Sequence, residues 1–205
     1  MTTFSIYAKI LIMNNNLFHG SPFDITDEYL RPGWSTHLQQ NCVYSTESKL
    51  MAIHYALFAK PDSDEFKSLS YFDKFKRNWE TIFIIKSPES LKGYIYEIAK
   101  PDINPIEYVN ETTGDFSTEY TPGAKAIFAI PGQTKILAKQ FVDYNYVKNT
   151  ITNPFRVFVL KKSYNFQQGI EKIQKKFKEI SDTPFQNQTE LNVMLGKVLD
   201  EYTEK

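Results

Sequence analysis

Residue types that could bind and cleave a nucleotide occur in three separate stretches of the chain. The first stretch places His19 directly before Gly20, the second contains Tyr44 and Tyr55, and the third carries Glu119. An imidazole edge beside a residue without Cβ can hydrogen-bond a ribose while a flat group approaches the backbone. Two aromatic rings can hold a planar ring between them by stacking and area burial. A carboxylate can accept a ribose hydroxyl and stabilise positive charge that forms on the sugar.

In this order and spacing, the residues resemble the His-Tyr-Glu core of the ADP-ribosyltransferases, in particular the poly(ADP-ribose) polymerase and diphtheria toxin branch. Enzymes of this family cleave NAD at the nicotinamide–ribose bond and transfer ADP-ribose to an acceptor. The similarity covers about residues 17–137, and its motifs are short but ordered. It implies a transferase that uses NAD as its co-substrate.

The resemblance also implies a role for individual residues in binding NAD. His19 would hold the adenosine-side ribose, and the backbone at Gly20 would bind the nicotinamide amide. Tyr44 and Tyr55 would flank the nicotinamide ring. The hydroxyl of Ser45 would either orient the amide or cap the helix that follows.

Glu119 is the catalytic glutamate that the resemblance implies. The chain departs from the family pattern at two positions, of which the first removes a side-chain bond to the nicotinamide amide and the second concerns the acceptor. Polymerases often place a serine three residues before the second tyrosine, where this chain has Ala52. Arginine-directed toxins carry Glu or Gln two residues before the catalytic glutamate, where this chain has Ser117. An arginine acceptor is therefore disfavoured. The acceptor is unidentified and can be a protein, a nucleic acid or a small molecule.

Each of these residues, taken alone, also fits an ordinary structural role. A His-Gly-Ser sequence is usually a turn, tyrosines are common in strands and half-buried helices, and glutamates are mostly exposed. Two other functions therefore stay open. One is a catalytically inactive domain that binds NAD or ADP-ribose, or that serves as an interaction domain. The other is an enzyme like the RNA 2′-phosphotransferases, which would need several arginines near the site, whereas the chain has only Arg31, Arg77 and Arg156.

Length and composition restrict the class of protein further. A chain of 205 residues is long enough for one domain with a sizeable core. Lys plus Arg equals Asp plus Glu at 24 each, so no net charge draws the chain to nucleic acid or to an acidic membrane. The single Cys42 cannot form an intrachain disulfide, and the three histidines are too scattered to predict a metal site.

The sequence also lacks the patterns of a membrane or secreted protein. No stretch approaches the roughly 18 apolar residues of a membrane-spanning helix. The apolar run at residues 4–13 has neither a basic segment before it nor a small-residue cleavage site after it, so we find no convincing signal peptide. We expect a cytoplasmic protein, or one that is delivered into a host cell.

The resemblance implies an α+β fold with split antiparallel β-sheets around an NAD cleft, flanking helices and a C-terminal helical segment. Hydrophobic patterns predict strands at residues 17–20, 43–45, 81–85, 93–98, 116–121, 126–130, 134–138 and 155–160. A helix capped by Thr46 or Ser48 is predicted to end at residue 59, and residues 62–79 are predicted to form a surface loop with a helical piece. We divide the chain into an N-terminal arm (1–13), an ADP-ribosyltransferase-like catalytic domain (14–160) and a C-terminal helical extension (161–205).

Overall fold

The computed structural model describes residues 16–59, 64–111, 115–150 and 156–204, which belong to two compact units. Unit 1 comprises Met1–Ala59 and Gly93–Val142, and unit 2 comprises Lys60–Lys92 and Asp143–Lys205. The N-terminal arm expected at residues 1–13 lies outside the described residues. The expected boundary at residue 160 lies inside unit 2, because the C-terminal helices share that unit with strands from residues 66–85 and 157–159.

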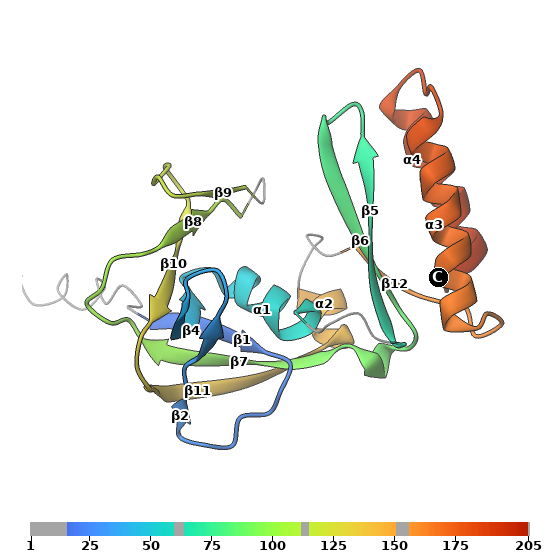
Figure 1. The fold of residues 1–205 in the computed structure, drawn as a ribbon. Coiled ribbons are helices and arrows are strands. Elements are labelled where there is room, and N and C mark those ends of the chain that lie inside the picture. The colour runs from blue at the N-terminus through green and yellow to red at the C-terminus, as the bar shows by residue number, and fades with distance from the viewer. Residues whose placement is uncertain (1–15, 60–63, 112–114, 151–155, 205) are drawn as a thin grey trace, which may run out of the picture. The chain divides into compact units, whose positions relative to one another are not determined.

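Unit 1 is built on an antiparallel sheet of nine strands. The strand order is β2-β11-β7-β1-β4-β10-β8-β9, and β3 pairs with β4 off this path (Figure 1). The bounds are β1 (Asn16–Ser21), β2 (Tyr29–Leu30), β3 (Gly33–Ser35), β4 (Gln40–Thr46), β7 (Lys92–Ala99), β8 (Glu107–Val109), β9 (Phe116–Ser117), β10 (Lys125–Ile130) and β11 (Thr134–Asp143). The predicted strand at residues 116–121 is therefore shorter in the structure.

Alternation along the strands gives the sheet of unit 1 two different faces. Buried side chains on one face form the core of the unit: Leu17, Leu30, Val43, Tyr96, Ile98, Ala126, Phe128 and Ile130. Helix α1 (Lys49–Phe58) packs on the opposite face of β1. Its N-cap is Ser48, whose Oγ accepts the backbone N–H of Met51 at 3.0 Å. Because Ser48 satisfies this helix end, Ser45 is not needed as a cap.

Glycines on two strands allow α1 to lie very close to the sheet. A Cβ placed on Gly20 would lie 1.9 Å from the backbone oxygen of Ala52, and one on Gly93 would lie 2.1 Å from that of Ala56. No real Cβ is found at such distances from a backbone oxygen. The small residues Ala52 and Ala56 are themselves fully buried at this contact. The close packing of α1 therefore depends on the missing side chains of the two glycines.

Unit 2 combines a small mixed sheet with helices. Strand β5 (Phe66–Asp73) pairs antiparallel with β6 (Asn78–Ile85), which pairs parallel with β12 (Val157–Val159). The helical elements are a 3-10 turn (Pro88–Ser90), α2 (Tyr144–Thr150), α3 (Phe166–Asp182) and α4 (Gln188–Tyr202). Helices α3 and α4 lie beside β5 and β6 (Figure 1). Apolar side chains of these elements form one buried cluster, which includes Leu69, Ile82, Ile173, Phe177, Leu195 and Val198.

The α+β class and the C-terminal helices are confirmed, whereas part of unit 2 differs from expectation. The predicted loop at residues 62–79 contains strand β5, in which Leu69 and Tyr71 are buried and the intervening Ser70 is exposed. This two-residue period was hidden by the surrounding charged residues. Within the described part of the chain, no helix combines the length and the apolar character required to cross a membrane.

Candidate functional site

The candidate site is a cavity at the point where β1 and β4 separate. These strands pair at a single register position, Phe18 with Thr46. A cavity of about 290 Å³ lies beside this pair, between residues 18–20 of β1 and residues 44–46 of β4. Tyr55, Ala59 and Ile127 complete its lining. The structure thus brings five of the six predicted site residues around one cavity: His19, Gly20, Tyr44, Ser45 and Tyr55.

The ring of His19 links the two separating strands. Its Nδ1 lies 2.6 Å from the backbone oxygen of Tyr44. A carbonyl oxygen only accepts hydrogen bonds, so Nδ1 carries the proton and donates it, which leaves Nε2 of the neutral ring as an acceptor. Burial lowers the pKa of His19, and the bond to the Tyr44 carbonyl only partly opposes this effect. His19 can therefore accept a hydrogen bond from a ligand hydroxyl near neutral pH.

A serine that sequence analysis missed holds the ring of Tyr44. The Oγ of Ser35 lies 2.7 Å from the Tyr44 hydroxyl and also accepts the backbone N–H of Leu38 at 3.1 Å. Ser35 reaches this position because β3 pairs with β4, where Ser35 is opposite Gln40. No local sequence signal relates Ser35 to Tyr44, since the contact depends on the pairing of two strands.

Tyr55 contributes an accessible aromatic ring to the same cavity. It lies on α1 with 38% of its surface exposed, although most large apolar residues of that helix are buried. Burial of the remainder raises the pKa of the Tyr55 hydroxyl, and the nearby Glu107 carboxylate raises it further. The Tyr55 hydroxyl is therefore neutral at physiological pH.

The hydroxyl of Ser45 is a buried polar group without a partner. Ser45 lines the cavity with 2% of its surface exposed, and its Oγ makes no hydrogen bond to the residues that the structure describes. Leaving a buried hydroxyl unsatisfied costs about 1–3 kcal/mol. Ser45 is opposite the core residue Phe128 of β10, and its Oγ is fully buried, so the hydroxyl does not face the cavity.

Glu119 is not among the residues that line this cavity. It follows β9, its side chain is exposed, and its backbone N–H donates to Oγ of Ser117 at 3.0 Å. Its catalytic role stays a prediction. No carboxylate or arginine side chain lines the cavity within the part of the chain that the structure describes. Of the arginines, Arg31 pairs with Asp27 at 2.9 Å and Arg156 donates to the hydroxyl of Tyr71 at 2.7 Å.

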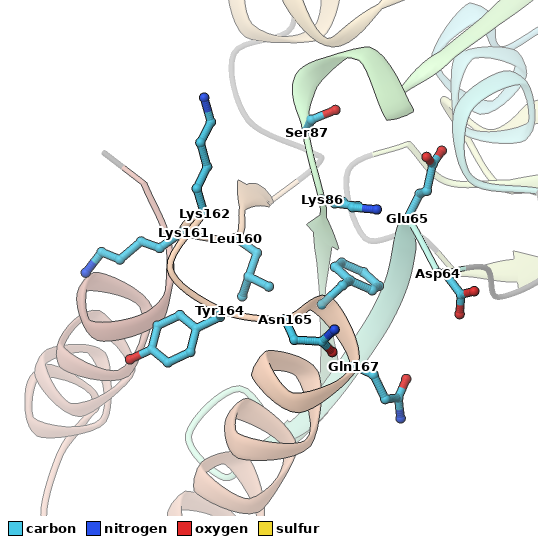
Figure 2. A pocket seen from close by; sticks show the side chains of 11 residues that line it. Asp64, Glu65, Lys86, Ser87, Leu160, Lys161, Lys162, Tyr164, Asn165 and Gln167 are labelled. Carbon is cyan, nitrogen blue, oxygen red and sulfur yellow. The ribbon is translucent and has the colours of Figure 1, made fainter.

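A second, larger cavity of about 680 Å³ belongs to unit 2 and contains none of the predicted site residues. Figure 2 shows that acidic and basic side chains both surround it, with Asp64 and Glu65 near Lys86. The Nζ of Lys161 donates to the backbone oxygens of Asp200 and Glu201 at 2.5 and 2.8 Å, so this lysine serves to cap α4. The mixed charges around the cavity do not favour one kind of ligand.

The described residues include no group of three or more His, Cys, Asp or Glu side chains arranged to hold a metal ion. Comparison of the chain with protein-family models, with curated proteins and with solved structures gave no match.

Two histidines of unit 1, His19 and His54, are expected to make the protein less stable in mild acid. Burial lowers the pKa of both His19 and His54 below the ordinary value of 6.5. As the pH falls through 6.5, the unfolded chain binds protons before the folded chain does, so the free energy of unfolding decreases with falling pH. We expect the melting temperature to drop between about pH 7 and pH 5. Carboxylates with a lowered pKa, such as Glu47 with its ordinary value of 4.5, lose their contribution at lower pH.

Thermal melts of two single variants test whether His19 contributes to the loss of stability in mild acid. His19→Gln should show a smaller drop between these pH values than the wild type, because one of the two histidines can no longer be protonated. His37→Gln changes an exposed histidine and should keep the wild-type dependence. A His19→Gln profile that matches the wild type would show that His19 contributes nothing to the acid sensitivity.

Proposed function

We propose that this protein is an NAD-dependent ADP-ribosyltransferase, which cleaves the nicotinamide–ribose bond of NAD and transfers ADP-ribose to an acceptor. One observation carries the proposal. Five residues that resemble the NAD-binding residues of that family come from β1, β4 and α1 and surround one cavity. Any one of them fits an ordinary structural role, but such roles do not require them to meet.

The chemistry of the cavity fits the nicotinamide half of NAD. Tyr44 and Tyr55 both line the cavity and would stack on the flat nicotinamide ring. Nε2 of His19 suits a ribose hydroxyl. A volume of about 290 Å³ is just below the range of about 300–1,000 Å³ that is typical of ligand pockets. The rest of the dinucleotide would extend outside the cavity.

The finer fold that we propose is the split antiparallel arrangement of the ADP-ribosyltransferases around an NAD cleft. It is supported by the contact between β1 and β4, which pair at one position and then separate at the cavity. Strand β1 instead pairs with β7 over six residues, and β4 pairs with β10 over four. The continuous sheet is therefore weakest at the cavity.

A second candidate is a domain that binds NAD or ADP-ribose without turning it over. The observation that favours it is the exposed side chain of Glu119, which does not line the cavity. This candidate shares the nicotinamide pocket with the first and differs only in having no carboxylate that acts on the ribose.

Release of free nicotinamide distinguishes the two candidates. Purified protein is incubated with NAD alone and with cell lysate, nucleic acid or free nucleotides as acceptors, and NAD binding is measured in parallel by calorimetry. An ADP-ribosyltransferase should release nicotinamide in at least one of these mixtures. If NAD binds but no mixture releases nicotinamide, the binding domain is the correct function. If NAD does not bind, both candidates are wrong.

A further inference from the structure

The pairing of four strands places a carboxylate on the cavity side of the sheet in unit 1. Phe18 of β1 is opposite Thr46 of β4, and Thr46 is opposite Ile127 of β10. Ile127 is in turn opposite Glu107 of β8. Residues directly opposite one another in antiparallel strands project from the same face of the sheet. Glu107 therefore projects from the same face of the sheet as Thr46 and Ile127 and lies one strand further out. Both of those residues line the cavity.

The electrostatic effect of Glu107 on Tyr55 agrees with its position on this face of the sheet. The negative charge of Glu107 contributes to the raised pKa of the Tyr55 hydroxyl, after the larger effect of burial. The carboxylate therefore interacts electrostatically with Tyr55, a residue that lines the cavity. Glu107 is half-buried, and its carboxylate makes no hydrogen bond or ion pair with the residues that the structure describes. A partly buried carboxylate of this kind is free to accept a hydrogen bond from a ligand.

Other carboxylates near β4 and α1 already have partners. Glu47 accepts hydrogen bonds from Nζ of Lys100 at 2.7 Å and from the backbone N–H of Ala126 at 3.1 Å. Glu111 accepts the hydroxyl of Ser48, the residue that caps α1. Using either of them on a substrate would disrupt a structural contact, whereas Glu107 has no such contact to lose.

We propose that Glu107 is the catalytic carboxylate of the cavity, which accepts a ribose hydroxyl of NAD and stabilises the positive charge that forms at C1′. This assignment rests on the proposed NAD chemistry. The bond between C1′ and the nicotinamide nitrogen breaks, and its electron pair stays on that nitrogen, which loses its positive charge. An oxygen lone pair of water or of the acceptor forms the new bond to C1′, and the proton of that oxygen passes to solvent. The carboxylate forms no covalent bond.

The test compares three glutamate-to-glutamine variants in nicotinamide release and in NAD binding. Glu107→Gln keeps the size of the side chain and removes its charge, so release should fall roughly 100-fold while NAD affinity changes less than about threefold. Glu119→Gln, at the position that the family resemblance selects, should have the smaller effect. Glu28→Gln changes an exposed glutamate of the same unit and serves as the matched control for loss of charge.

The outcomes separate this assignment from the proposed function. A loss of more than tenfold in Glu107→Gln, with NAD binding and the circular dichroism melt preserved, supports the assignment. If Glu107→Gln keeps more than a tenth of the wild-type rate, the assignment is overturned while the enzyme stands. If the wild type itself releases no nicotinamide under any acceptor condition, the proposed function and this assignment are both overturned.

Discussion

Replacing Gly20 by alanine is expected to lower the free energy of unfolding of unit 1 by about 1–3 kcal/mol or more. The new Cβ would lie 1.9 Å from the backbone oxygen of Ala52 and 2.7 Å from the backbone nitrogen of Ala56. Both atoms belong to the backbone of α1, so no side chain can rotate to relieve the collision. The helix must move away from β1, and the apolar contacts between them weaken. Urea unfolding followed by circular dichroism measures the loss.

The matched control for this substitution is Gly132→Ala. Gly132 has no heavy atom within 4 Å of an added Cβ, so the same change there should alter stability by less than about 0.5 kcal/mol. Gly20→Ala should also weaken NAD binding, because the displaced helix carries Tyr55 away from the cavity. Equal stability of the two alanine variants would mean that α1 does not pack on β1 as described.

Removing the ring of Tyr55 should weaken NAD binding about 10- to 100-fold. Stacking of one aromatic side chain on a flat base contributes about 1–3 kcal/mol by alanine substitution. Tyr55 is 38% exposed, so Tyr55→Ala should cost less stability than the loss of a fully buried ring and should leave the fold intact. Tyr55→Phe keeps the ring and should bind NAD nearly as well as the wild type. Calorimetric titration with NAD, together with a thermal melt of each variant, measures both effects.

The matched control for Tyr55→Ala is Tyr29→Ala. Tyr29 lies on β2 of the same unit with 42% of its surface exposed, and it does not line the cavity. Its removal should leave NAD binding unchanged. If Tyr55→Ala and Tyr29→Ala bind NAD equally well, the nicotinamide ring does not stack on Tyr55, and the tyrosine pair has only a structural role.

Local sequence patterns predicted most elements that hold the cavity. The alternation around Leu17 and Val43 indicates strands, and the spacing of Leu50, Ile53 and Leu57 after a capping residue indicates α1. These signals lie within a few residues of one another, so they can be detected without knowing the fold. Strand β5 was missed because its flanks are charged, and its buried alternation becomes clear only against the apolar face of α3.

The sequence by itself, through the family that its residue types and their order resemble, selected the residues that are proposed to bind NAD: His19, Gly20, Tyr44, Ser45 and Tyr55. Only the tertiary structure decided that they surround one cavity, and that Glu119 lies outside its lining. The tertiary structure also shows that Gly20 allows α1 to pack closely on β1. It shows in addition that Ser35 contacts Tyr44 and that Glu107 is opposite Ile127. The physical reason is that strand pairing joins residues distant in sequence. The row from Phe18 to Glu107 depends on the register of three strand pairs, which no local sequence pattern specifies.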